Sequence, residues 1–222
     1  MSIVILTRPK LQADAFANDL RGFINCDIYI LPLIEIEAMA SAEVPSDCAV
    51  IFTSANAVAT AKADKGTFAL CVGDATADAA IAAGFQAASV NGTASDVANH
   101  ILSDPDLRSL SWLHPHGAHV AGKIAELLRH EKVSVKTKVT YRQTAMTWSK
   151  DQKTLVENSR CLFPVFSPNG ANVLSKELND LAGQRHFVAI SAATAQHLPP
   201  NTVISDAPTR AAMLKTVAAV MR

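Results

Sequence analysis

Short apolar runs alternate with segments of helical periodicity along most of the chain. Residues 3–6 form an apolar, β-prone run, and apolar residues then recur at helical spacing from Leu11 to Leu20. A second β-prone run follows at residues 28–31. This order predicts a β-α-β unit at the start of the chain.

The same alternation resumes at residue 49 and continues, with one interruption, to the end. Strands separated by helices in this way predict parallel sheets covered on both faces, that is, an α/β fold. Predicted strands are residues 49–53, 69–72, 87–90, 112–113, 133–139, 161–166, 187–190 and 203–204; predicted helices are 75–83, 95–102, 118–130, 171–181 and 209–221, with further helix starts at Asn56 and Ala193.

Two extended segments, 33–37 and 139–144, lack the apolar run of a core strand and have no helix directly after them. We interpret them as connectors that leave and re-enter a first domain. The sequence therefore predicts one domain from residues 1–34 and 146–222. A second domain, 38–138, is inserted into it through linker strands 35–37 and 139–145.

Two short patterns recur in both halves, in the same order and at nearly constant spacing. Residues 70–77 lead from an apolar strand through a glycine turn to Ala-Thr-Ala, and residues 189–195 follow the same course. Just upstream, residues 52–56 are matched by 166–169. This repetition indicates a duplicated α/β unit.

The length of the chain fits two small domains, and its balanced charges predict no strongly charged surface. The 222 residues suffice for two cores of about 100 residues each. Lys and Arg total 20 and Asp and Glu total 20, so we expect no nucleic-acid or anionic-membrane partner. Any anionic ligand would have to be bound by local groups.

The start of the chain lacks the basic lead and long apolar run of a signal peptide, and no later segment reaches the roughly 20 apolar residues of a membrane span. We therefore expect a cytoplasmic protein. The four cysteines make no C-x-x-C pair, and we expect buried, reduced thiols rather than a metal or redox site: Cys26, Cys48, Cys71 and Cys161.

Small hydroxylated turns fall where parallel sheets bind ligands. Beyond the carboxyl ends of such strands, helix N-termini expose unpaired amides. Thr53-Ser54 and residues 73–76 occupy such places in the middle domain, and residues 167–169 and 191–194 in the outer one. If the domains face each other, these turns would line a cleft suited to several carboxylates or phosphates. The alternative is that the hydroxyls only cap helices.

Motifs for dinucleotide, P-loop, esterase and zincin chemistry are missing. His114, His116 and His119 form a metal-like cluster, which we interpret instead as solvated or ligand-facing imidazoles at a strand-to-helix turn. Tyr141 lies on the second connector, where a phenol could donate a hydrogen bond to a leaving oxygen. The other tyrosine, Tyr29, lies in an apolar run and is expected in the core.

These residues together resemble the uroporphyrinogen-III synthase family over nearly the whole chain. Each motif alone is weak, but their order and spacing are specific. The resemblance rests on Leu6-Thr7-Arg8-Pro9, the connector 32–36, the segments 52–58 and 72–77, the Tyr141 connector, Phe166-Ser167-Pro168, Ser191, Ala193-Thr194-Ala195, and Pro208-Thr209 with Met213-Leu214.

The resemblance implies two similar flavodoxin- or Rossmann-like parallel-sheet domains joined by a two-stranded linker. It implies a carbon–oxygen lyase of tetrapyrrole biosynthesis that closes linear hydroxymethylbilane to uroporphyrinogen III with loss of water and inversion of ring D. No cofactor or metal is implied. A monomer is expected, with the preceding pathway enzyme as a partner. The end product served could be haem, sirohaem, cobalamin or chlorophyll.

By the same resemblance, Tyr141 assists departure of the hydroxyl, and a set of residues in both halves binds the substrate carboxylates. That set is Arg8, Thr53, Ser54, Asn56, Gly73, Thr76, Ser167, Ser191 and Thr194. The chain departs from the family at residues 114–117, His-Pro-His-Gly, where many relatives carry an Arg-Gly pair.

Two other functions fit the pattern of residues. A non-catalytic two-lobed small-molecule-binding protein would share the plan, and Tyr141 would then be dispensable. A flavodoxin-like flavin binder is less favoured, because hydroxyl-rich turns occur in both halves and no pair of aromatic residues brackets a ring.

Overall fold

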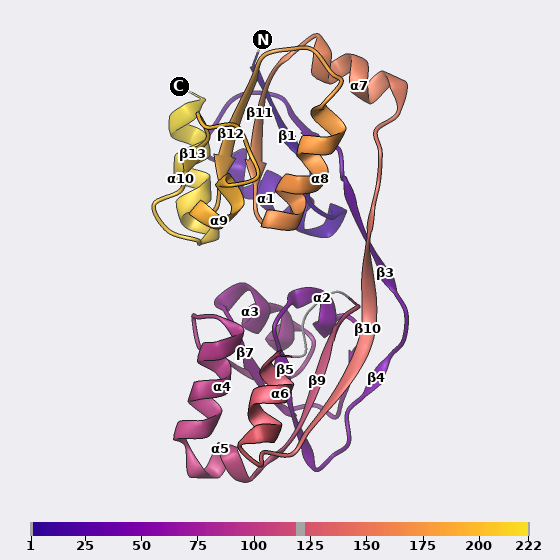
Figure 1. The fold of residues 1–222 in the computed structure, drawn as a ribbon, viewed down its shortest axis with the longest axis vertical. Coiled ribbons are helices and arrows are strands. Elements are labelled where there is room, and N and C mark those ends of the chain that lie inside the picture. The colour runs from indigo at the N-terminus through magenta and orange to yellow at the C-terminus, as the bar shows by residue number, and fades with distance from the viewer. Residues whose placement is uncertain (1, 119–122, 222) are drawn as a thin grey trace. The chain divides into compact units, whose positions relative to one another are not determined.

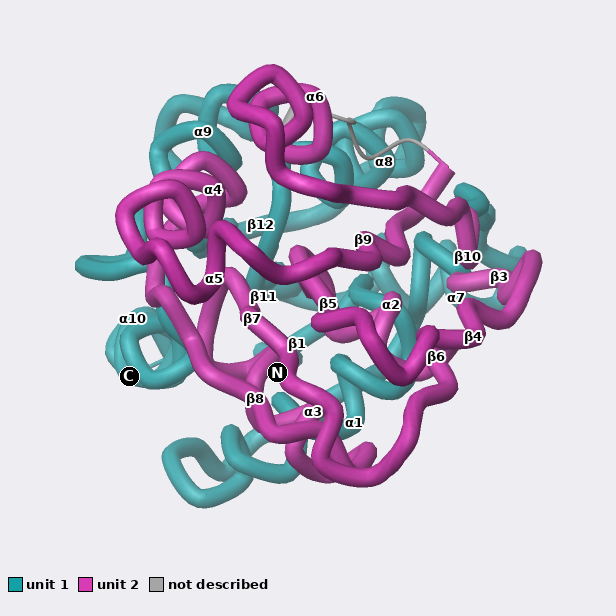
Figure 2. The backbone as a smooth tube through the Cα atoms, turned by 90° about the horizontal axis from the view of Figure 1, so that it is seen from below, with its two compact units in different colours: residues 1–35, 144–222 teal, residues 36–143 magenta. Residues whose placement is uncertain are grey.

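The computed structural model describes residues 2–118 and 123–221 and contains two compact units (Figures 1 and 2). Unit 1 comprises Met1–Glu35 and Thr144–Arg222, and unit 2 comprises Ile36–Gln143. Unit 1 is therefore built from both ends of the chain. The domain boundaries expected from the sequence stay a prediction.

Unit 1 contains a five-stranded sheet in which all neighbouring strands are parallel. Its first strand in the chain, β1, lies inside the sheet, between β2 and β11. Numbered by position in the chain, the strands lie in the flavodoxin-like order 2-1-3-4-5. The strands are β2 (Ile28–Ile30), β1 (Ser2–Leu6), β11 (Arg160–Val165), β12 (Arg185–Ala189) and β13 (Val203–Ile204).

Both faces of this sheet carry a buried apolar cluster, because successive side chains of a strand point to opposite faces. Val4 and Leu6 join the cluster formed with α1 (Lys10–Leu20) and α10 (Arg210–Val220). Ile3 and Ile5 join the cluster on the other face, which includes residues of α7 (Lys150–Glu157) and α8 (Pro168–Leu178). The short helix α9 (Ala192–Ala195) follows β12.

Unit 2 contains a six-stranded sheet, and its first central strand, β5, again lies inside. From β8 to β10 the strands pair in parallel, and in chain order they read 3-2-1-4-5, as the first five strands of a Rossmann sheet do. The strands are β8 (Gln86–Ser89), β7 (Phe68–Cys71), β5 (Cys48–Phe52), β9 (Ser111–Gly117), β10 (Val135–Ala145) and β3 (Ile34–Ala38); β4 (Ala42–Glu43) and β6 (Ala61–Lys62) pair separately.

Helices cover both faces of the larger sheet in unit 2. Helices α4 (Ala94–Ser103) and α6 (Lys123–His130) contribute to one buried cluster, together with Ile51 and Trp112. On the other face, α2 (Ala55–Val58) and α3 (Asp74–Ala82) contribute to a cluster that includes Phe52 and Phe85. A short helix, α5 (Pro105–Ser109), leads into β9.

The parallel α/β architecture predicted from the sequence is confirmed, but several elements differ. Helix α7 was not predicted, although its Ser149 and Gln152 form a capping box. Helix α4 begins at Ala94, one residue before the predicted helix, and is capped by Thr93, because the side chains of Thr93 and Asp96 accept from each other's backbone N–H groups. The helix expected over 118–130 runs from Lys123 among the described residues, and β9 continues to Gly117.

The free thiols of Cys48, Cys71 and Cys161 are buried, as expected, and Cys26 is half-buried. Burial raises the pKa of Cys71 and of Cys161 to about 11, so both stay protonated at neutral pH. Among the described residues, no helix has both the length and the apolar character needed to cross a membrane.

The two tyrosines lie in different environments. Tyr29, on the edge strand β2, is 36% exposed, so its assignment to the core was wrong. Tyr141 is 1% exposed and joins the apolar cluster on the α2–α3 face. The edge position of β2 explains the exposure of Tyr29, since no strand covers its outer side.

Burial of Tyr141 depends on a register shift between β9 and β10. Val139 pairs with His116 and Tyr141 pairs with Gly117, so Thr140 is an extra residue on β10. The bulge lets the consecutive residues Thr140 and Tyr141 both be buried. A Cβ atom on Gly117 would lie 2.8 Å from two ring carbons of Tyr141. Only glycine leaves room for the phenol ring at this position.

We therefore expect Gly117→Ala to destabilise unit 2 by about 1–3 kcal/mol, because the enclosed Tyr141 ring would have to shift. The measurement is urea unfolding of a Trp148→Phe background, in which Trp112 of unit 2 is the remaining tryptophan. Gly73→Ala is the matched control: no atom lies within 4 Å of its added Cβ, so only the poorer cap residue should contribute, with a cost below about 1 kcal/mol. Equal stability of the two variants would contradict the packing argument.

Candidate functional site

In unit 1 the chain reverses its direction of winding between β1 and β11. The connection after β1 leads to β2 on one side, and the later strands are added on the other side. Loops that follow such a pair of strands diverge, and ligands bind in the crevice they leave. Arg8 follows β1 and Ser167 follows β11, so both lie at this switch point.

Arg8 is a largely buried cation. Its guanidinium carbon lies 3.9 Å from the centroid of the Phe166 ring, a cation–π contact. Burial, with a smaller contribution from Arg210, lowers the pKa of Arg8 to about 10, so it keeps its charge at neutral pH. Among the residues the structure describes, no carboxylate forms an ion pair with Arg8, whereas Arg210 pairs with Asp19 at 2.6 Å. Arg8 is therefore suited to an anionic ligand.

Two serines of unit 1 cap helices that follow neighbouring strands, and one of them lies at the same switch point as Arg8. Ser167 accepts a hydrogen bond from the Gly170 N–H at 3.0 Å and caps α8, while Ser191 caps α9. Both are partly exposed, and a hydroxyl that accepts a cap bond can still donate one. Thr194 differs: it is fully buried, with its hydroxyl 3.2 Å from that of Ser191.

Unit 2 repeats this arrangement at its own switch point, between β5 and β9. Thr53 and Ser54 follow β5, and Ser54 caps α2 by accepting from the Asn56 N–H at 3.2 Å. Gly73 is the N-cap residue of α3, the helix after the adjacent strand β7. The place where a side chain of residue 73 would lie is open, so a ligand can approach the backbone closely. Thr76, two residues into α3, is mostly buried.

Among the described residues, His114 is the one buried imidazole. It lies on β9, is 1% exposed, and places Nε2 3.2 Å from the Thr53 hydroxyl oxygen. Its Nδ1 has no hydrogen-bond partner within the described ranges. Burial, and secondly His116, lowers the pKa of His114 from 6.5 to about 4. Of the two environments expected for the histidines, solvated or ligand-facing, the solvated one was wrong for His114, because β9 extends through it and both faces of its sheet are covered. The ligand-facing alternative stays a prediction.

A metal centre at the histidines has no support from the geometry. His119 lies outside the described residues, and within the ranges 2–118 and 123–221 no three His, Cys, Asp or Glu side chains gather as metal ligands. His116 instead lies with its Nδ1 2.9 Å from the Gly117 carbonyl oxygen.

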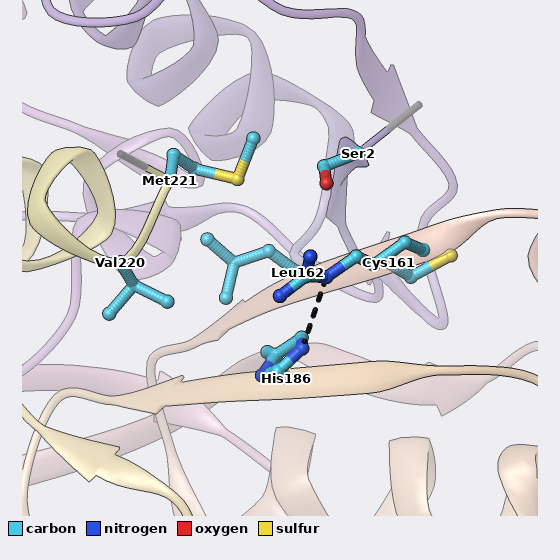
Figure 3. Close-up of a pocket in the computed structure, with 7 residues that line it drawn as sticks. Ser2, Cys161, Leu162, His186, Val220 and Met221 are labelled. Atoms are coloured by element: carbon cyan, nitrogen blue, oxygen red, sulfur yellow. Dashed lines mark hydrogen bonds between the residues drawn. The ribbon is translucent and has the colours of Figure 1, made fainter.

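A cavity of about 230 Å³ lies in unit 1 at the amino-terminal ends of the strands, whereas the candidate residues follow their carboxyl ends (Figure 3). It is lined by the amino-terminal residues of β1, β11 and β12 and by the end of α10, and Arg160 Nε donates to His186 Nε2 at 3.3 Å. Because ligands of parallel sheets bind at the carboxyl ends, this cavity is separate from the candidate residues.

Sequence reasoning found the hydroxyl turns but missed two contacts, Arg8 with Phe166 and Thr53 with His114. Strand parity could have indicated the second. Ile51 and Trp112 share the α4–α6 cluster, and alternation then places Thr53 and His114 on that same face of neighbouring strands.

The buried imidazole predicts acid sensitivity of unit 2. As the pH falls below about 6.5, His114 is protonated in the unfolded chain but not in the folded one until about pH 4, so folded stability is lost over this window. The expected loss is on the order of 3 kcal/mol relative to His114→Gln, which does not titrate. Urea unfolding of both proteins in the Trp148→Phe background, at several pH values between about 4 and 7, measures the difference. Parallel pH profiles would contradict the assigned burial.

Comparisons with known proteins agree with the resemblance. The family model of uroporphyrinogen-III synthase HemD matches residues 24–215. The crystal structure of uroporphyrinogen-III synthetase from Helicobacter pylori aligns over 100% of both chains, with a TM-score of 0.67 at 16% identity. That of a mutant uroporphyrinogen III synthase from the extremely thermophilic bacterium Thermus thermophilus aligns over 100% of both, with a TM-score of 0.51 at 15% identity. No curated protein sequence matches.

The two likenesses at low identity establish the shared fold, and the family match spans most of the chain. The match favours a synthase of tetrapyrrole biosynthesis over the non-catalytic binding protein. The chain belongs to the uroporphyrinogen-III synthase family.

Proposed function

We propose that this protein closes linear hydroxymethylbilane to uroporphyrinogen III, with loss of water and inversion of ring D, and so acts as a carbon–oxygen lyase. The family match carries this proposal. The geometry supports it, because the switch point of each unit offers hydroxyls and helix-start amides, the groups that bind carboxylates.

The substrate carries acetate and propionate groups, and we propose that both units contribute to binding them. In unit 1, Arg8 supplies a cation that has no acidic partner among the described residues, and its contact Phe166 directly precedes the cap residue Ser167. In unit 2, Thr53, Ser54 and the open backbone at Gly73 supply neutral donors. Distributed donors of this kind suit a chain whose formal net charge is zero. Asn56, Thr76, Ser191 and Thr194 complete the proposed set, Thr194 through its neighbour Ser191.

Control of conformation is the main catalytic task in this proposal. The substrate loses its hydroxyl with help from a pyrrole nitrogen, and closure without inversion is the reaction that occurs unaided. The protein must therefore hold the reacting ends in the geometry that leads to inversion. We propose that Tyr141 donates its phenolic proton in a hydrogen bond to the departing oxygen. Because the phenol is buried in unit 2, this role requires that substrate binding uncover it.

We also propose that the two units are separate domains, 1–34 with 146–222 and 38–138, joined by 35–37 and 139–145. We further propose that the protein is a monomer and that it receives its substrate from the preceding pathway enzyme. The reduced cysteines are those expected of a cytoplasmic protein, which is the location we propose.

The isomer composition of the product tests the proposed activity. Hydroxymethylbilane is generated in the presence of the protein, and the cyclised, oxidised products are separated by isomer. Type III product is expected. Type I product alone, at the rate measured without protein, would contradict the proposal and favour the non-catalytic binding protein.

In this assay Tyr141→Phe should lower kcat for the type III product by roughly 10²-fold or more, the usual contribution of a positioned proton donor. The ring is retained, so stability should change by no more than about 1 kcal/mol. Tyr29→Phe, on the edge strand of unit 1, is the matched control and should leave kcat unchanged. Full turnover by Tyr141→Phe would remove the proposed role.

The cap residues can be separated into structural and substrate-binding ones. Ser167→Ala and Ser149→Ala each remove a serine that caps a helix in unit 1, and each should cost about 1 kcal/mol of stability. Only Ser167→Ala should also raise KM, by roughly threefold to tenfold, since it loses a carboxylate donor. An equal KM for the two variants would show that Ser167 has a capping role alone.

A further inference from the structure

The hydrogen bond between Thr53 and His114 can run in either direction, because either atom can donate in the 3.2 Å contact. His114 is neutral near pH 7, since burial lowers its pKa to about 4, and a neutral imidazole carries one N–H. Its Nδ1 is buried and has no hydrogen-bond partner in the part of the chain that the structure describes. The position of the single proton therefore decides which atom of the pair donates.

The unpartnered Nδ1 fixes that choice. If the proton were on Nδ1, a buried N–H would lack an acceptor, and orphaned N–H groups are rarer than under-satisfied acceptors. If the proton is on Nε2, it is used in the bond to Thr53, and Nδ1 is left as a bare acceptor. Nε2–H therefore donates to Thr53 Oγ1, and the threonine hydroxyl proton is free to point elsewhere.

We propose that His114 is a positioning residue that turns the Thr53 hydroxyl into a dedicated hydrogen-bond donor toward a carboxylate of the substrate. The proposal rests on the proposed function, which places Thr53 among the carboxylate-binding residues. An ionised carboxylate only accepts hydrogen bonds, so a hydroxyl whose lone pair already accepts from an imidazole matches it. Thr53 is partly exposed and is the residue directly after β5, at the switch point of unit 2.

His116 provides an internal reference for this assignment. Its Nδ1 lies 2.9 Å from the Gly117 carbonyl oxygen, which can only accept, so its Nδ1 carries a proton. The two neighbouring rings, 5.2 Å apart between centroids, are therefore expected to hold opposite tautomers when neutral.

The first test is long-range ¹H–¹⁵N correlation of the imidazole rings in the wild-type protein at pH about 8.5, roughly two units above the ordinary histidine pKa. His114→Gln and His116→Gln spectra assign the two rings. We expect the Nε2–H form for His114 and the Nδ1–H form for His116. The Nδ1–H form at His114 would overturn the proposal, and this result needs neither turnover nor a stable variant at Thr53.

The second test is steady-state kinetics with hydroxymethylbilane. His114→Met removes the donor and should raise KM roughly threefold to tenfold while kcat changes less than about twofold. His114→Gln keeps an N–H near the position of Nε2 and should remain within about twofold of wild type. His130→Gln, on an exposed side chain at the end of α6, is the control and should be unchanged.

A double-mutant cycle shows whether His114 acts through Thr53. In a Thr53→Val background, His114→Met should raise KM no further; an equal rise in both backgrounds, or an unchanged KM in His114→Met alone, would overturn the proposal. Failure of the proposed function has a different signature: the wild-type protein would form no type III product, while the tautomer spectra would still decide the direction of the hydrogen bond.

Discussion

The candidate site depends on where each sheet reverses its winding. In both units the first strand of the parallel set is an inner one, with the next strands added on one side and the later ones on the other. This order separates the loops after β1 and β11, and after β5 and β9, and leaves helix starts with unpaired amides there. Arg8, Ser167, Thr53 and Ser54 are all residues of these loops. Binding groups are thus placed by strand order before any side chain is considered.

The sequence predicted this architecture because its signals are local. Apolar runs, helical spacing and small hydroxylated turns identify strands, helices and their junctions. Helix α7 was missed because its first turns are polar, although the spacing of Ser149 and Gln152 in its capping box was a readable signal. Strand β10 was predicted as two segments, 133–139 and 139–145, for a related reason: its middle residues are exposed, so they lack the apolar pattern of one continuous core strand.

The environments of single side chains could not be predicted in the same way. Tyr141 is buried because one extra residue in β10 changes the face on which the following side chain lies, and nothing local in the sequence marks that bulge. His114 is buried because residues from α4 and α6 cover its face of the sheet, a long-range effect. Arg8 lies over Phe166, a residue far away in the sequence. The candidate residues therefore stay a prediction, and their partners and exposure required the structure.

The way unit 1 is assembled also affects how the chain folds during synthesis. Unit 2 is continuous, so all of its strands from β5 to β10 are available once Ala145 has been made. Strand β1, in contrast, needs β11 as its inner neighbour, and α10 covers one of its faces only when the last residues are complete. Val4 and Leu6 thus have their early partners in α1 and β2 but lack those in β11 and α10 through most of translation. Until α10 has been made, this early apolar strand is shielded from aggregation by its pairing with β2 or by chaperones.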